Sequence, residues 1–151
     1  EIASWAENIV VKVATTPEGL PAIHHLSQKG IAVNATLIFS AAQGFLAIKA
    51  GAKYVSPFIG RLDDIGGDGI SVVSDLVDFV ETHGYPSEVL AASIRHPTHV
   101  IEVAKAGAHI VTMPYDVLMK LIRHPLTDTG LEQFLKDWKA VEEKLKKIPI
   151  G

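Results

Sequence analysis

Short apolar runs rich in β-branched residues alternate along the chain with longer stretches in which apolar residues recur every three or four positions. The short runs predict β-strands and the longer stretches predict amphipathic helices. The strands are expected at residues 9–13, 32–39, 54–58, 88–94 and 109–113. The helices are expected at residues 17–30, 41–50, 70–82, 97–106, 115–123 and 128–147. The pattern therefore predicts a βα unit repeated five times, followed by one further helix.

Residues with capping preferences stand at the ends of these helical stretches. Thr16 precedes Pro17, a pair typical of a helix start, and Ser40 and Asp68 are the expected N-caps of the next two long helices. Gly30 and Gly51 follow the first two helices at the position where glycine ends a helix.

The predicted strands are apolar on both faces, which indicates a parallel sheet covered by helices. Two α/β architectures fit, an open doubly wound sheet or part of a (β/α)8 TIM barrel. No Gly-x-Gly-x-x-Gly motif follows a strand, which disfavours the first. The candidate site residues lie in or just after the C-terminal halves of strands, which a barrel would bring to its catalytic face: Lys12, Asn34, Thr36, Ser56, Arg61, Ser93 and Arg95. We therefore expect the barrel.

The chain has 151 residues, and its five units therefore average about 30 residues each. A complete barrel typically needs roughly 200 to 250 residues. The sequence also begins with Glu1 rather than methionine. We expect residues 1–151 to be the C-terminal part of a single barrel domain whose first three strands are absent.

Composition restricts the function classes. Hydrophobic residues make up 48% and charged residues 21% of the chain, typical of a folded domain, and the net charge is −3. We therefore expect no nucleic-acid or anionic membrane partner. The absence of cysteine excludes disulfides, thiol nucleophiles and cysteine-bound zinc and fits a reducing compartment. With no secretory signal and no apolar run long enough to cross a bilayer, a cytoplasmic protein is expected.

Lys12 lies within the apolar strand Ile-Val-Val-Lys-Val. It must either extend toward solvent at an edge strand or lie in a water-poor interior. Burial disfavours the ammonium form, and a neutral amine can attack a ketone to form a Schiff base, whose iminium accepts electrons. Lys12 is therefore a candidate nucleophile, with a solvent-facing strand lysine as the alternative.

Polar residues at period-two spacing follow on the next two strands. Asn34 and Thr36 point to the same side and could bind a polyhydroxylated ligand or hold a water against an iminium carbon. Ser56 and Phe58 repeat this spacing. The alternative is that these side chains serve strand structure and packing alone.

Arg61, Ser93 and Arg95 form a second candidate group. Two guanidinium groups at separate strand ends can grip a phosphate, with the serine as a further donor, and so fix the reacting carbon of a substrate. The alternative is an ordinary loop ion pair between Arg61 and Asp63 or Asp64.

No metal or cofactor is expected. His96 and His99 have an acceptable spacing for a metal, but no third ligand is in view. The last predicted helix, residues 128–147, carries an apolar stripe that could cover its own core or dock on a neighbouring subunit: Leu131, Phe134, Leu135, Trp138, Val141 and Leu145.

Four motif-bearing segments carry the candidate residues, and two more lie near the C-terminus. They are residues 10–16 (VVKVATT), 34–43 (NATLIFSAAQ), 54–64 (YVSPFIGRLDD), 91–97 (AASIRHP), 123–128 (RHPLTD) and 134–138 (FLKDW). Together they resemble the transaldolase family, in particular its small bacterial and archaeal branch, which includes fructose-6-phosphate aldolase. The similarity covers essentially the whole chain in order.

The resemblance implies a metal-free Schiff-base enzyme on a (β/α)8 barrel. Lys12 would capture the dihydroxyacetone unit of a ketose phosphate, Asn34 would bind that unit, and Thr36 would position the catalytic water. The remaining candidates would line the pocket (Ser56 and Phe58) or hold the phosphate (Arg61, Ser93 and Arg95). The enzyme would transfer the dihydroxyacetone unit from sedoheptulose 7-phosphate to glyceraldehyde 3-phosphate, a reaction of the pentose phosphate pathway. The resemblance also implies a ring-like homo-oligomer, a pentamer or decamer.

Two alternatives remain. The first is a fructose-6-phosphate-type aldolase that releases dihydroxyacetone; such aldolases tend to carry Tyr at the position of Phe58 and a residue other than Asn at Asn34. The second is a catalytically incomplete barrel fragment. The family's acid/base aspartate comes from its first strand, which is absent from the predicted elements, so this chain alone is expected to transfer protons poorly.

Overall fold

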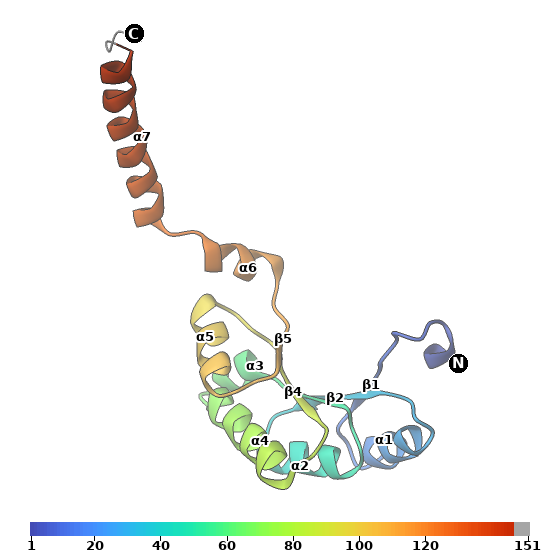
Figure 1. Ribbon diagram of the computed structural model, residues 1–151. Coiled ribbons are helices and arrows are strands. Elements are labelled where there is room, and N and C mark those ends of the chain that lie inside the picture. The colour runs from blue at the N-terminus through green and yellow to red at the C-terminus, as the bar shows by residue number, and fades with distance from the viewer. Residues whose placement is uncertain (147–151) are drawn as a thin grey trace.

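The computed structural model describes residues 1–146 and confirms the predicted α/β architecture of alternating strands and helices (Figure 1). The strands are β1 (Val11–Ala14), β2 (Val33–Ile38), β3 (Tyr54–Pro57), β4 (Glu88–Ala91) and β5 (Ile110–Val111). The helices are α1 (Gly19–Gln28), α2 (Ala41–Lys49), α3 (Ile59–Asp63), α4 (Gly69–His83), α5 (Pro97–Lys105), α6 (Tyr115–Ile122) and α7 (Pro125–Leu145), and a 3-10 turn, η1, spans Ile2–Ser4.

The strands form one parallel sheet in the order β1-β2-β3-β4-β5. This order follows the chain without reversal, as in a run of consecutive barrel strands. The sheet is open in the described part of the chain, with β1 and β5 at its two ends. The fold is therefore that of a partial barrel-like βα repeat.

Helices α1, α2, α4 and α5 lie along one side of the sheet (Figure 1). The core fills the space between them, where Val33, Val55 and Val89 from the strands meet Ile23 and Leu76 from the helices, all with 0% of their surface exposed. Alternate strand residues point to the opposite side of the sheet. One face of the sheet thus supplies the core, and the other is free to carry polar groups.

Local capping accounts for most helix boundaries. Ser40 and Asp68 accept hydrogen bonds from the backbone N–H groups of Gln43 and Ser71, at 3.3 and 2.9 Å, as N-cap residues do. The predicted start of the first helix is two residues early: Thr16 accepts from the N–H of Gly19 at 3.0 Å, and the regular helix begins at that glycine.

Several other elements differ from the prediction; β1 covers Val11–Ala14 rather than 9–13, and β4 ends at Ala91 rather than 94. Helix α3 occupies residues expected to be a loop, and β5 is shorter than its predicted range of 109–113. Helix α7 begins at Pro125 rather than Asp128, because His124 caps it by accepting from the N–H of Leu126 at 3.2 Å. The predicted end of this helix, residue 147, lies outside the described residues.

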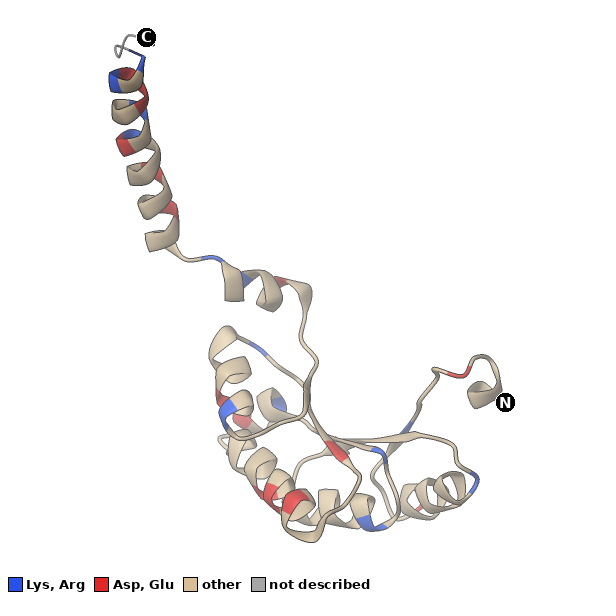
Figure 2. Ribbon diagram, viewed as in Figure 1, with Lys and Arg blue, Asp and Glu red and all other residues tan. Residues whose placement is uncertain are grey.

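Helices α6 and α7 leave the sheet, and α7 extends away from the rest of the chain (Figure 1). None of its described residues is buried, and Trp138 in the middle of the apolar stripe is 59% exposed. Acidic and basic positions are distributed along this helix (Figure 2). The stripe therefore does not cover the core of its own chain. Within residues 1–146, no helix combines the length and the apolar character needed to cross a membrane.

Candidate active site

Four of the predicted site residues share the sheet face that the helices leave uncovered. Lys12 on β1 is aligned with Asn34 on β2, and Asn34 is aligned with Tyr54 on β3. Aligned residues of neighbouring strands point to the same side, as do residues two apart on one strand. Thr36, two residues beyond Asn34, and Ser56, two beyond Tyr54, therefore lie on the face that carries Lys12.

A short hydrogen bond joins two of these residues across the strands. The Ser56 hydroxyl donates to Oδ1 of Asn34 at 2.6 Å. Ser56 is fully buried and Asn34 is half-buried, so the hydrogen bond is partly shielded from water, which strengthens it. It fixes the rotation of the Asn34 amide and leaves the amide NH₂ as the donor available to a ligand.

In the described part of the chain, Lys12 lies in a solvent-exposed position on the sheet. Its side chain is exposed, while the neighbouring Val11 and Val13 are half-buried. Lys12 lies on β1, at one end of the sheet, and its neighbour Val13 packs against the core. Successive strand residues point to opposite faces, so Lys12 belongs to the face away from the core. The alternative foreseen from the sequence, a solvent-facing lysine on an edge strand, is the arrangement observed.

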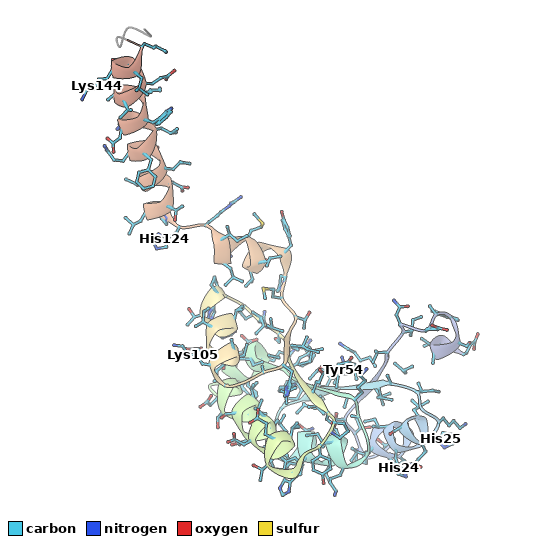
Figure 3. The ribbon with its side chains drawn as sticks, in the orientation of Figure 1. His24, His25, Tyr54, Lys105, His124 and Lys144 are labelled. Carbon is cyan, nitrogen blue, oxygen red and sulfur yellow. The ribbon has the colours of Figure 1, made fainter. Side chains whose placement is uncertain are left out.

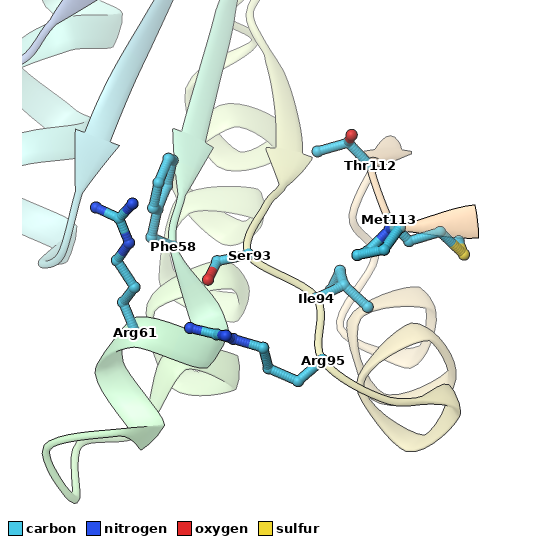
Figure 4. Close-up of a pocket in the computed structure, with 8 residues that line it drawn as sticks. Phe58, Arg61, Ser93, Ile94, Arg95, Thr112 and Met113 are labelled. Atoms are coloured by element: carbon cyan, nitrogen blue, oxygen red, sulfur yellow. The ribbon is translucent and has the colours of Figure 1, made fainter. Parts of the chain in front are cut away.

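The second predicted group surrounds a hollow of about 470 Å³ at the C-terminal ends of β3, β4 and β5 (Figure 4). Its lining includes all of Phe58, Arg61, Ser93 and Arg95, joined by Ile94, Thr112, Met113 and Pro114. The Arg95 guanidinium extends toward Ser93 and Arg61 (Figure 4). The structure thus brings the two arginines and the serine to one cavity. Such a group of hydrogen-bond donors can bind an anion.

Each arginine has a neighbour that restrains its guanidinium. Arg61 lies over the Phe58 ring, 5.0 Å from its centroid, and that ring makes an edge contact with Phe39 at 5.8 Å between centroids. Arg95 pairs with Asp64 at 3.0 Å, with both side chains more than half exposed. The ion pair with Asp64 is therefore made by Arg95, and Arg61 contributes to the lining of the hollow.

The loop that carries Ser93 has an unusual backbone. Ser93 has a φ of +61°, a left-handed conformation that costs a residue with a side chain about 1 kcal/mol or more. Its carbonyl oxygen accepts from the N–H of Gly60 at 3.0 Å. A Cβ at position 60 would lie 2.3 Å from this oxygen, so the close approach requires glycine. The surroundings thus hold the strained residue at the edge of the cavity.

The comparison with known proteins identifies a family. The family model described as transaldolase/fructose-6-phosphate aldolase matches residues 1–150. The chain belongs to this family. Among its relatives, it is 56% identical over 144 residues to a protein from Heliobacterium modesticaldum named probable transaldolase. It is 57% identical over 138 residues to a probable transaldolase from Geobacillus thermodenitrificans.

These alignments cover 95% and 91% of this chain and 67% and 65% of the two relatives. A third relative of the transaldolase family, the probable transaldolase of Herpetosiphon aurantiacus, is 56% identical over 142 residues, which is 64% of its length. The chain thus spans about two thirds of the length of the curated relatives that it matches. The family assignment confirms the predicted resemblance.

Several residues of the cavity are not among those predicted from the sequence. Thr112 and Pro114 follow β5 directly, so the rule that selected the other candidates, position just after a strand, would have found them. His99 was considered only as a metal ligand. The described residues contain no group of three or more His, Asp or Glu side chains placed to hold a metal ion. His99 instead bonds to Asp63, at 2.8 Å.

Proposed function

We propose that this protein acts as a transaldolase that moves a dihydroxyacetone unit between sugar phosphates through a Schiff base on Lys12. The observation that carries the proposal is the alignment of Lys12 with Asn34 on one face of the sheet, whose strands β3 and β4 lead into the cavity of Arg61 and Arg95. An amine, a fixed amide and an anion site are the parts needed to hold a ketose phosphate by both ends.

The proposed reaction has four stages. Nζ of Lys12 adds to the C2 carbonyl of sedoheptulose 7-phosphate, and loss of water gives an iminium ion. The C3–C4 bond then breaks as the C4 hydroxyl loses its proton, and the bonding electron pair moves into the iminium to give an enamine. Erythrose 4-phosphate leaves, and the enamine carbon adds to glyceraldehyde 3-phosphate, whose carbonyl oxygen takes a proton. Hydrolysis releases fructose 6-phosphate and restores the amine.

The other residues have supporting roles in the proposal. The Asn34 amide, oriented by Ser56, donates to a hydroxyl of the three-carbon unit. Thr36, 8% exposed and two residues along the same strand face, holds the water that hydrolyses the iminium. Arg61, Ser93 and Arg95 hold the phosphate of donor and acceptor in turn.

Lys12 must be unprotonated when it attacks the ketone, and exposure to bulk water opposes this. We propose that the uncovered face becomes the interior of a (β/α)8 barrel to which residues 1–151 contribute the C-terminal part. The ordering of the strands and the placement of helices on one face support this proposal. The family resemblance assigns the acid/base aspartate to the first strand of that barrel.

Transfer and simple aldol cleavage can be separated by one substitution. Phe58→Tyr would place a hydroxyl beside the proposed enamine, where it can help protonate the carbon and release dihydroxyacetone. We expect the ratio of dihydroxyacetone release to transfer to rise at least threefold, measured by coupled assays with sedoheptulose 7-phosphate in the presence and absence of glyceraldehyde 3-phosphate. An unchanged ratio contradicts the proposed position of Phe58, and dominant release by the unmodified chain favours the aldolase.

We also propose that the exposed stripe of α7 packs against a second copy of the chain in a ring-like homo-oligomer. Its support is the apolar character of the stripe, in which Phe134 is 72% and Trp138 59% exposed. Sedimentation at micromolar concentration should show a pentamer or decamer, and replacing Phe134 and Trp138 together by Ser should reduce the mass to that of the monomer. A monomeric parent chain contradicts the proposal.

A further inference from the structure

His99 lies next to the candidate anion cavity without lining it. It is 5% exposed, and both nitrogens of its ring are engaged. Nδ1 accepts from the backbone N–H of Arg95 at 3.3 Å, and Nε2 lies 2.8 Å from Oδ2 of Asp63. Because Nδ1 is an acceptor, the proton of the neutral ring is on Nε2, which donates to the carboxylate.

These two bonds join the segments that carry the two arginines. Asp63 is the last residue of α3, two positions after Arg61 on the same short helix. Arg95 precedes α5, on the loop that begins with the left-handed Ser93. The path Asp63–His99–Arg95 therefore connects the backbone of one arginine-bearing segment to that of the other.

Two backbone hydrogen bonds and one ion pair also connect the segment of Arg61 to that of Arg95, and they differ in strength. Gly60 donates to Ser93 and Ile59 donates to Ala92, both at 3.0 Å, but these bonds end before Arg95. The Asp64–Arg95 ion pair is more than half exposed on both sides, and such pairs contribute little. Among the described residues, His99 is the buried side chain that accepts a hydrogen bond from the backbone of Arg95. We therefore expect this bond to restrain the position of Arg95 most.

We propose that His99, held by Asp63, is a positioning residue that sets the separation of the Arg61 and Arg95 guanidinium groups for the phosphate of the substrate. The inference rests on the proposed anion site. Binding of one phosphate by two arginines depends on the distance between their guanidinium groups. Schiff-base formation by the amine on β1 does not depend on that distance. Loss of the tie should therefore weaken the binding of phosphorylated donors and leave Schiff-base formation intact.

The test uses the full chain and two donors, fructose 6-phosphate and dihydroxyacetone, which lacks the phosphate. His99→Leu removes both bonds, and KM for fructose 6-phosphate should rise about tenfold, with kcat within about twofold. Borohydride trapping with dihydroxyacetone should be unchanged. His99→Asn keeps an acceptor near the Arg95 N–H and should restore KM to within about threefold of the parent value. His24→Leu, on the exposed side of α1 (Figure 3), is the matched control and should change nothing.

A double-mutant cycle separates positioning from general stability. If His99 acts through Arg95, His99→Leu should raise KM by less than about twofold when Arg95 is already alanine. An equal rise in both backgrounds overturns the proposal, and so does an unchanged KM in His99→Leu alone. Should His99→Leu fail to fold, Asp63→Ala takes its place, because Asp63 is 39% exposed, and it must raise KM at least threefold for the proposal to stand. Arg95→Ala without any effect on KM would instead reject the anion site itself.

Discussion

The two faces of the sheet differ in burial and polarity, although their residues alternate along the same strands. On the face toward the helices, Val33, Ala35 and Val55 are completely buried in the core. On the other face, Lys12 is exposed, and Asn34 is half-buried with its amide fixed by a hydrogen bond. Neighbouring residues on one strand therefore have different environments. In the proposed mechanism, one face supports stability and the other carries the chemistry.

This separation has a physical basis. A parallel strand presents successive side chains to opposite faces, so a polar residue can be placed on one face without disturbing apolar packing on the other. The face that carries the polar groups can then change with little cost in stability, while the core face cannot.

The neighbours Val55 and Ser56 test this separation most strongly. Val55→Ala removes two methyl groups from the core and should lower the free energy of unfolding by about 2 kcal/mol, with kcat/KM within twofold of the parent value. Ser56→Ala is the matched change on the other face; it should cost about 1 kcal/mol or less but lower kcat/KM about fivefold, because the Asn34 amide loses its restraint. Chemical denaturation and steady-state kinetics measure both. The reverse pattern would mean that the faces are not separate in function.

An effect smaller than that of Val55→Ala is expected where a buried glycine approaches the candidate anion cavity. Gly60→Ala places a Cβ 2.3 Å from the carbonyl oxygen of Ser93 and 2.6 Å from Cγ of Arg95, so the loop must shift. We expect KM for fructose 6-phosphate to rise about tenfold, or about 1.4 kcal/mol.

Gly130→Ala is the matched control for that change. A Cβ at this position on α7 meets nothing within 4 Å, and alanine favours a helix over glycine, so the same kinetic assay should show no change. A Gly60→Ala variant with the parent KM would show that the cavity does not depend on this close approach.

Most of the fold could be predicted from the sequence because its signals are local. Strands and helices follow from apolar periodicity, and Ser40 and Asp68 start helices through bonds to residues three positions away. The grouping of Arg61, Ser93 and Arg95 also follows from a general rule, the meeting of parallel strand ends at one edge. The roles of these residues in catalysis stay predictions.

The remainder depends on contacts between distant parts of the chain. The periodicity of α4 and α7 is similar, yet Leu76 on α4 is fully buried and Trp138 on α7 is exposed, because only α4 has the sheet beside it. The exposure of Lys12 likewise depends on what covers β1, and the His99–Asp63 bond joins residues whose pairing has no local pattern. Periodicity indicates which face is apolar but does not identify its partner.

The most direct test of the proposed chemistry is borohydride reduction of the full chain in the presence of fructose 6-phosphate, followed by peptide mass mapping. The proposal predicts added mass on the peptide that contains Lys12, its loss in Lys12→Ala, and its retention in Lys29→Ala, which alters an exposed lysine just after α1. Added mass on any other peptide, or labelling that persists in Lys12→Ala, would contradict a Schiff base at Lys12.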